Sequence, residues 1–307
     1  MRILVLGAGV VGSVYAGRLL HAGHDVVLLA RGPRLANLQT QGLILEDAES
    51  GKRTCLPVVS VSEIAPQDHF DLTLVTVRAE QLGSTLTVLT GMKDHGHVLF
   101  FGNTGNHREE LTAALGDRAL FGSPAVAGTR DGPVIRYVRI RQQKTVLGEP
   151  DGTTTSRVRH LQGVLAAAGF PTRISADIEG WLVGHAAFVV PIAFALYRVD
   201  VDAARLAADP ATMRLMVGAT REAFTSLRAG GNGEIPQNLL LLYRLPMVFV
   251  IAYWRRVLLS PRGELWFGGH SRAAPQEMRT LAQGLLEELR RTGRPTPELE
   301  RLLTTPI

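Results

Sequence analysis

The sequence predicts two domains of different fold class: an N-terminal α/β domain with a doubly wound, mostly parallel sheet, and a C-terminal all-α domain. In the first half of the 307-residue chain, short β-rich apolar runs alternate with helical stretches. Such alternation implies a parallel sheet covered by helices on both faces. After about residue 155 the pattern is helical almost throughout, and 46% hydrophobic residues suffice for a sizeable core.

The strands of the first domain are expected where four apolar runs of buried-strand length occur, at 3–7, 25–30, 72–77 and 97–102. Helices are expected between or after these runs at 11–22, 83–90 and 107–115. Two further runs, 133–140 and 144–149, predict a β-hairpin that extends the sheet, and 157–168 predicts a closing helix.

The second domain is predicted from helix-length segments that glycine- and proline-containing breaks separate. These segments are 177–197, 211–229, 237–258, 273–291 and a short 297–303. We expect residues 1–172 to form the first domain and residues 173–307 to form a helical domain for substrate binding and dimerisation.

A glycine loop follows the first predicted strand. Gly7, Gly9 and Gly12 form a GxGxxG pattern that opens a helix. In a Rossmann-like domain the first glycine permits a tight turn, the second lets the backbone approach a pyrophosphate, and the third allows close packing. The helix N-terminus, with Val10 and Val11, would supply backbone N–H groups to the phosphates. We predict dinucleotide binding, and a purely structural turn is the alternative.

The end of the second predicted strand indicates which dinucleotide binds. Sites for NAD place Asp or Glu there to bind the ribose 2′-hydroxyl, whereas this chain has Arg31, with Arg34 nearby. A guanidinium suits a 2′-phosphate. We therefore predict NADP(H) as the cofactor, and a solvated strand-end arginine is the alternative reading of Arg31.

The chain resembles the ketopantoate reductase (2-dehydropantoate 2-reductase) family. The resemblance rests on the glycine loop with Leu29-Ala30-Arg31, on Val77-Arg78-Ala79-Glu80-Gln81, on Asn103-Thr104-Gly105, on Glu179-Gly180-Trp181 and on Arg262-Gly263-Glu264. It implies that Arg78 and Gln81 contact the cofactor. It also implies that Asn103 positions substrate and nicotinamide, and that Glu264 hydrogen-bonds the substrate.

This chain departs from the family pattern where the chemistry lies. The resemblance implies a catalytic lysine two residues after Trp181, where Val183 stands, and asparagines at the positions of Ala187 and Pro191. Only three of the 33 cations are lysines, and none follows Lys144. A shifted alignment therefore cannot supply the missing acid, and we expect a substrate other than ketopantoate.

Two histidines are candidates to replace the lysine as proton donor. His185 lies one helical turn after Trp181, and His270 lies in a glycine-rich break before a helix for which Ser271 is a candidate N-cap. An imidazole can protonate a developing alkoxide near neutral pH. Either histidine can equally be a structural residue. Carboxylates at metal-ligand spacing are not evident near them, and we predict no metal.

Residues of two kinds are candidates for contact with the substrate. Arg255, Arg256 and Arg272 are candidates to hold a carboxylate in a bidentate pair. The aromatic residues Tyr243, Trp254, Trp266 and Phe267 fit either an apolar pocket or a helical core.

Composition narrows the partners and the setting. The net charge is +5, but the arginines are scattered among acidic residues and aromatics are only 6%, so we expect no nucleic-acid partner. The longest apolar runs are shorter than the roughly 18 residues of a membrane span. With one cysteine, Cys55, no intrachain disulfide is possible. We expect a cytoplasmic homodimer that acts on a small molecule.

Three functions fit these observations. The first is an NADPH-dependent reductase of a carbonyl or imine compound, with Asn103 positioning the reactants and His185 or His270 donating the proton. The second is a non-redox catalyst, such as an isomerase or cyclase, or an NADP-bound sensor on the same fold. The third is an opine-type dehydrogenase.

Overall fold

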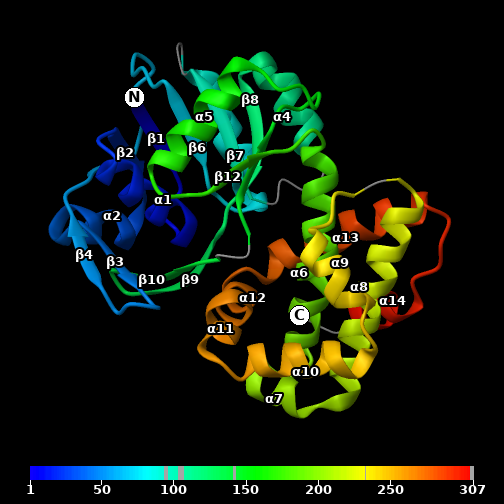
Figure 1. Cartoon of the computed structure of the whole chain (residues 1–307). Helices are drawn as coiled ribbons and strands as arrows, with labels where there is room; N and C mark the ends of the chain where they lie inside the picture. The colour runs from blue at the N-terminus through cyan, green and yellow to red at the C-terminus, as the bar shows by residue number, and fades with distance from the viewer. Residues whose placement is uncertain (93–95, 103–106, 141–142, 232, 305–307) are drawn as a thin grey trace. The chain divides into compact units, whose positions relative to one another are not determined.

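The chain folds into two compact units, Met1–Ile178 and Glu179–Ile307, in a computed structural model (Figure 1). It describes residues 1–92, 96–102, 107–140, 143–231 and 233–304. The first unit is an α/β domain on a mostly parallel sheet, and the second consists of helices. The predicted fold class is confirmed. The division falls next to Ile178, whereas the sequence placed it between residues 172 and 173.

Within the described residues, the large sheet has eight strands in the order β12-β11-β8-β7-β6-β1-β2-β5. All neighbouring strands are parallel except β8 and β11. The strands are β1 Arg2–Leu6, β2 Asp25–Leu29, β5 Val59–Val61, β6 Leu72–Val75, β7 His97–Phe101, β8 Ala119–Ser123, β11 Thr145–Gly148 and β12 Thr172–Ile174. The strand order reverses at β1, which lies between β2 and β6. Ligands of such sheets bind beyond the carboxyl ends of the strands at this point.

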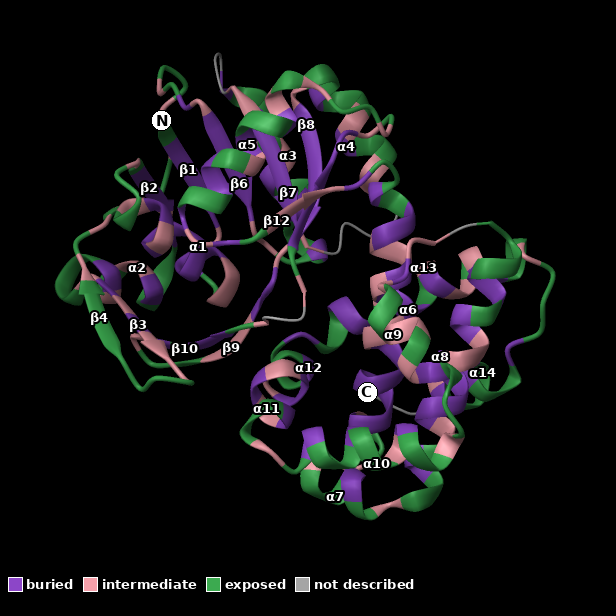
Figure 2. Cartoon of the chain, in the orientation of Figure 1, coloured by how far each residue is buried: buried purple, intermediate pink, exposed green. Residues whose placement is uncertain are grey.

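Helices flank the large sheet and turn their exposed faces outward, while the strands are buried (Figure 2). They are α1 Val10–His21, α2 Gly32–Gln41, α3 Leu82–Gly91, α4 Arg108–Leu115 and α5 Ser156–Ala167. The strand residues Ile3, Leu4 and Leu72 are fully shielded from solvent. This burial explains the continuous apolar runs in the sequence.

A second sheet of four strands packs on α1. Its order is β4-β3-β10-β9, with bounds β3 Leu43–Asp47, β4 Arg53–Leu56, β9 Val126–Asp131 and β10 Val134–Arg139. At Gly17 of α1 an added Cβ would lie 2.5 Å from Leu45 Cδ1. Helix and sheet are thus in close contact here, and a larger residue at position 17 would displace the end of the Leu45 side chain.

The predicted hairpin of 133–140 and 144–149 is wrong. Both runs are strands, but β10 pairs with β9 and β3, whereas β11 joins the large sheet between β8 and β12. An apolar run indicates burial of a segment but does not specify which neighbour it pairs with.

The helical unit is built around α6, Ile178–Tyr197 (Figure 1). The other helices are α7 Ala203–Ala208, α8 Pro210–Ala229, α9 Gln237–Arg244, α10 Met247–Leu258, α11 Pro261–Gly263, α12 Gly269–Ala273, α13 Pro275–Arg291 and α14 Pro297–Leu303. By length and composition alone α6 could span a membrane, but 67% of its most apolar stretch is buried within the protein. It lies in the core with Ala187, Val190 and Ala195 fully buried.

Two expectations in the helical unit are wrong. The predicted helix 237–258 is two helices, because Pro246 holds Leu245 in an extended conformation, with ψ 156°. Ser271 is not an N-cap. It lies within α12, and α13 begins with Pro275.

Candidate active site

The glycine loop connects β1 to α1 and has the geometry of an anion cradle. Gly7 has a φ of +107°, which favours glycine. An added Cβ on Gly12 would lie 2.0 Å from the Gly7 carbonyl oxygen and 2.4 Å from Thr76 Oγ1. An added Cβ on Gly9, in contrast, would meet nothing within 4 Å. The loop is thus packed tightly on one side and open at Gly9.

The N-terminus of α1 supplies donors to this open side. Gly9 is the N-cap and offers no capping side chain, and the first turn contains no acidic residue. The first helical hydrogen bond runs from Ser13 N to Gly9 O, so the N–H groups of Val10, Val11 and Gly12 have no partner within the helix. Unpaired N–H groups and the helix dipole favour an anion here. These residues fit the phosphates of a dinucleotide.

Thr76 holds the loop from the neighbouring strand. It follows β6, and its hydroxyl lies within hydrogen-bonding distance of Leu6 O (3.0 Å) and Gly7 O (2.9 Å). Its backbone N–H donates to Leu6 O as well, at 2.8 Å. This role of Thr76 is not predicted from the sequence, because the predicted strand includes residue 76 as an ordinary strand position.

Arg31 and Arg34 lie close in sequence and differ in environment. Arg31 is the N-cap residue of α2, its side chain is exposed, and no ion pair among the described residues involves it. Arg34 is 8% exposed and donates hydrogen bonds to Ala8 O, Pro133 O and Ser13 Oγ. Arg31 is thus available to a ligand, whereas Arg34 is bonded to the protein.

The other residues assigned to the cofactor lie beyond β6. Arg78 is exposed, and its Nη1 lies 4.0 Å from Glu80 Oε1. Gln81 is exposed and accepts a hydrogen bond from the Arg78 N–H at 3.2 Å. Asn103 lies outside the described residues.

The two candidate proton donors, His185 and His270, are neighbours within the helical unit. His185 is partly buried on α6, and His270 is exposed on α12. Burial, and to a smaller extent the nearby His270, lower the pKa of the His185 imidazole from 6.5 to about 4. His185 is therefore neutral at physiological pH. In that state it can donate one N–H hydrogen bond.

The positions at which the resemblance implies polar residues are apolar and packed. Val183 contacts the core of the helical unit, Ala187 is fully buried within it, and Pro191 is buried as well. This stretch of α6 thus contributes packing, and His185 is its titratable side chain.

Glu264 forms an ion pair with Arg272. It begins a π-helical turn, Glu264–Gly268, between α11 and α12, and π-turns are frequent at functional sites. Its carboxylate accepts hydrogen bonds from Arg272 Nη1 at 2.6 Å and Nη2 at 3.3 Å. Gly268 makes room for the carboxylate, since a Cβ there would lie 2.4 Å from Oε2. The carboxylate that Arg272 holds is thus that of Glu264.

The remaining candidate substrate-binding residues differ in burial. Arg255 and Arg256 are exposed on α10, whereas Tyr243, Trp254 and Phe267 are buried in the aromatic core of the helical unit. Trp254 has its ring centroid 5.9 Å from that of Phe267. Within the described ranges no group of three His, Cys, Asp or Glu side chains is arranged to hold a metal.

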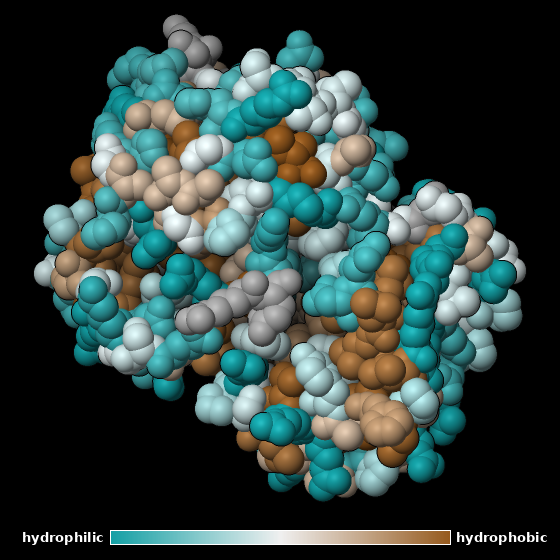
Figure 3. All heavy atoms as spheres, in the orientation of Figure 1, coloured by the Kyte–Doolittle hydropathy of each residue, from teal (hydrophilic) through white to brown (hydrophobic). Residues whose placement is uncertain are grey.

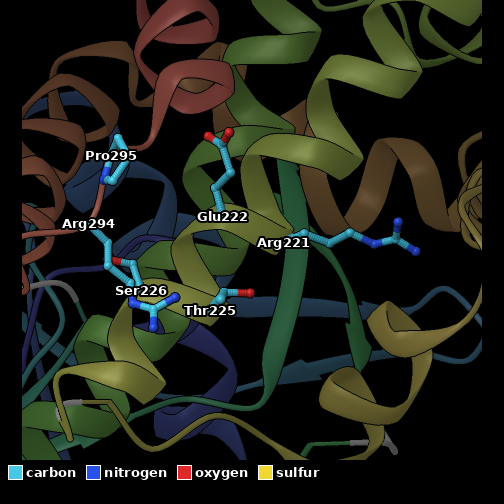
Figure 4. A pocket seen from close by; sticks show the side chains of 6 residues that line it. All are labelled: Arg221, Glu222, Thr225, Ser226, Arg294 and Pro295. Carbon is cyan, nitrogen blue, oxygen red and sulfur yellow. The ribbon is translucent and has the colours of Figure 1, made fainter.

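A depression of about 340 Å³ lies elsewhere on the helical unit, between α8 and the segment that joins α13 to α14 (Figure 4). Its lining residues are Arg221, Glu222, Thr225, Ser226, Arg294 and Pro295. Glu222 accepts hydrogen bonds from the N–H groups of Glu298 and Leu299 at the start of α14. This carboxylate therefore serves as a helix cap, and the depression contains none of the predicted site residues.

The first unit, with its reversed strand order and open glycine loop, defines a dinucleotide-binding protein of the Rossmann type. Residues 3–152 match the model of the family described as "Ketopantoate reductase PanE/ApbA". This match lies within the first unit, which is therefore similar to this family over residues 3–152, just under half of the chain.

Curated relatives match over part of their length. The chain is 29% identical over 182 residues to the "Uncharacterized oxidoreductase YkpB" of Bacillus subtilis, covering 58% of this chain and 59% of that protein. It is 30% identical over 178 residues to the 2-dehydropantoate 2-reductase of Archaeoglobus fulgidus, covering 58% and 57%. The matched region thus spans less than two thirds of these relatives.

Solved structures match over nearly the whole chain. The 2-dehydropantoate 2-reductase of Geobacter metallireducens is 20% identical with a TM-score of 0.80, covering 99% of this chain and 98% of that one. A D-mandelate dehydrogenase with NADH and anilino(oxo)acetate is 17% identical with a TM-score of 0.74, covering 99% and 96%. At these identities the likeness concerns the fold.

Proposed function

We propose that this protein is an NADPH-dependent reductase of a carbonyl or imine compound other than ketopantoate. The observation that carries the proposal is the glycine loop, open at Gly9, together with Arg31 where a carboxylate would select NAD. An exposed guanidinium without an ion-pair partner among the described residues suits a 2′-phosphate. Gly7, Val10, Val11, Gly12, Arg78 and Gln81 complete the cofactor contacts.

The substrate is bulkier and less polar than ketopantoate. Val183, Ala187 and Pro191 replace polar residues of the family pattern, and the carboxylate of Glu264 is bonded to Arg272. The D-mandelate dehydrogenase of similar fold has an aryl-bearing oxoacetate bound, which supports aromatic 2-oxo acids as the first compounds to test.

When bound, the nicotinamide supplies the hydride. The protein then has to deliver a proton to the oxygen or nitrogen that gains charge. The neutral His185 imidazole would donate an N–H hydrogen bond to this atom, but it does not give up that proton at physiological pH. The proton itself would come from His270 or from a water molecule. Donation from a neutral imidazole is used in other enzymes to polarise a carbonyl.

A turnover screen tests the proposal. NADPH consumption is measured with 2-oxo acids, ketones, imines and, for the opine-type alternative, an amino acid plus a 2-oxo acid. We expect oxidation of NADPH with at least one aryl 2-oxo acid. Binding of NADPH without oxidation across the whole panel would exclude a reductase.

Arg31→Ala tests the cofactor assignment. Loss of one charge-assisted contact to a 2′-phosphate should weaken NADPH binding about tenfold or more and leave NADH binding nearly unchanged. Equal effects on the two cofactors would contradict the assignment of Arg31 to the 2′-phosphate.

The second candidate function is a non-redox catalyst, such as an isomerase or cyclase, or an NADP-bound sensor. The bonding of Glu264 to Arg272 favours it, since together with the loss of lysine it removes two polar groups that the family resemblance implies. Rearrangement of a substrate without consumption of bound NADPH would distinguish it from the reductase.

We further propose that the protein is a cytoplasmic homodimer. Supporting this assembly, six large apolar side chains of the helical unit are exposed: Leu241, Leu245, Val248, Phe249, Tyr253 and Leu259.

A further inference from the structure

Arg34 is a buried cation directly behind the glycine loop. Its Nε donates to Ala8 O at 3.1 Å, its Nη2 to Ser13 Oγ at 3.0 Å and its Nη1 to Pro133 O at 2.9 Å. One side chain thus joins the loop, the first turn of α1 and the turn between β9 and β10. Burial of an arginine without a carboxylate is costly, so this arrangement calls for an explanation.

The hydrogen bond to Ala8 O fixes the orientation of one peptide group. Ala8 O also accepts from Ser13 Oγ, at 3.2 Å. In a planar trans peptide the carbonyl and the following N–H point in opposite directions. Because Arg34 and Ser13 hold the Ala8 carbonyl toward the protein, the Gly9 N–H points away from them. This N–H belongs to the residue at which the loop is open.

The charge of Arg34 is balanced by no acidic partner among the described residues. Its three hydrogen-bond acceptors are neutral, and burial followed by the nearby Arg130 lowers its pKa to about 10. Arg34 therefore remains protonated at neutral pH. Its positive charge adds to that of the α1 N-terminus, and the nearby Arg130 on β9 makes an anion still more favourable there.

We infer that Arg34 is a positioning residue of the cofactor site, which orients the Ala8–Gly9 peptide toward the pyrophosphate and places a fixed positive charge behind it. This inference rests on the proposed function. It separates two arginines three positions apart: Arg31 selects the 2′-phosphate, and Arg34 serves the pyrophosphate that NADPH and NADH share.

Binding of NADPH, NADH and ADP to folded variants tests this division. Equilibrium affinities are measured by nicotinamide fluorescence and, for ADP, by calorimetry. Arg34→Met should weaken all three ligands by a similar factor of about ten or more, with the NADPH-to-NADH ratio unchanged. Arg31→Ala is the matched control, because it should change this ratio. Arg34→Lys keeps the charge without the fork and should recover part of the affinity.

Each result of these binding measurements either supports or overturns the inference about Arg34. Affinities of Arg34→Met within twofold of the wild type overturn the inference, and so does a loss confined to NADPH, which would place Arg34 on the 2′-phosphate. A wild-type protein that binds neither dinucleotide overturns the proposed function together with the inference. Wild-type binding with an unaffected Arg34→Met variant overturns the inference alone.

A milder variant covers the case in which Arg34→Met does not fold. Ser13→Ala removes the hydroxyl that bonds both Ala8 O and Arg34, and Ser13 itself is fully buried. We expect NADPH, NADH and ADP to bind about threefold more weakly. Unchanged binding by this folded variant would overturn the part of the inference by which the Ser13 and Arg34 bonds together orient the Ala8–Gly9 peptide.

Discussion

Gly12 shows how one missing methyl group shapes the candidate site. A Cβ there would approach the backbone oxygen of Gly7 to 2.0 Å, and this neighbour is a backbone atom that cannot rotate away. Gly12→Ala should therefore abolish measurable NADPH binding and lower the free energy of unfolding by about 2 kcal/mol or more, as overpacking does. Fluorescence titration and urea unfolding measure the two effects.

Gly163→Ala is the control for this substitution. Gly163 lies on the exposed face of α5, where a Cβ would meet nothing within 4 Å. Alanine there should leave cofactor binding unchanged and stabilise the helix by about 0.5–1 kcal/mol. If Gly12→Ala behaved like this control, the packing of the loop would be wrong.

His185 makes stability depend on pH. Its pKa is about 4 in the folded protein and 6.5 when exposed. Between these values the unfolded chain binds a proton that the folded chain does not, so stability falls as pH decreases from 6.5 toward 4. His185→Gln should remove up to about 2 kcal/mol of this pH dependence, allowing for its partial exposure.

Urea unfolding at pH 5 and pH 7 measures the effect. His24 and His97 also have pKa values lowered by burial, so part of the slope remains in the variant. His21→Gln, at an exposed histidine, is the control. A pH dependence of stability identical in His185→Gln and the wild type would contradict the burial of this imidazole.

At the scale of elements, one buried ion pair fastens α5 to the large sheet. Glu149 follows β11 and is 2% exposed, and it accepts hydrogen bonds from Thr155 and from Arg157, whose Nε lies 2.8 Å from Oε1. Arg157→Met would leave a buried carboxylate without its cation. We expect a loss of about 3 kcal/mol in urea unfolding.

The same helix offers a control. Arg159→Met changes an exposed arginine two residues away and should alter stability by less than about 0.5 kcal/mol. Equal effects of the two substitutions would show that the ion pair does not hold α5 in place.

The sequence predicts the elements of this fold better than their partners. Local patterns identify the strands β1, β2, β6 and β7, because continuous apolar runs and the glycine loop are local signals. The partners of β10 and β11 depend on contacts with distant segments such as β3 and β12, which no local pattern contains. The break at Pro246 is predictable from the sequence, since proline disfavours a helical conformation of the residue before it.

The candidate site likewise contains some residues whose roles the sequence predicts and others whose roles it does not. Gly7, Gly9 and Gly12 are predictable because their spacing encodes a backbone geometry. The roles of Thr76 and Arg34 are not, because each bonds carbonyl groups 26 to 99 residues away, and these bonds exist only in the folded chain. The pairing of Glu264 with Arg272 likewise depends on the π-helical turn, which has no sequence signature here.

At the scale of the whole molecule, the exposed apolar stripe is the feature to test. It consists of Leu241 on α9, Leu245 in the break between the two helices, and Phe249 and Tyr253 on α10, and apolar side chains gather on the helical unit (Figure 3). Contiguous exposed apolar surface marks interaction sites. We expect sedimentation to give a dimer for the wild type and a monomer for Phe249→Glu.

Val59→Glu is the matched control for this substitution. Val59 is 59% exposed, close to the 61% of Phe249, but it lies on β5 in the first unit. The control should remain dimeric. A wild-type monomer, or a Phe249→Glu variant that stays dimeric, would exclude the stripe as the dimer interface.

The distribution of lysine makes the two units chemically distinct. All three lysines lie in the first unit, so the helical unit has no lysine amine for acylating reagents. Reagents that crosslink two lysines therefore cannot join two helical units directly. The exposed thiol of Cys55, the single cysteine, gives the first unit its own attachment point for a fluorophore. Lysine- and thiol-directed probes thus report on the cofactor-binding unit alone, and the helical unit requires carboxylate- or guanidinium-directed chemistry.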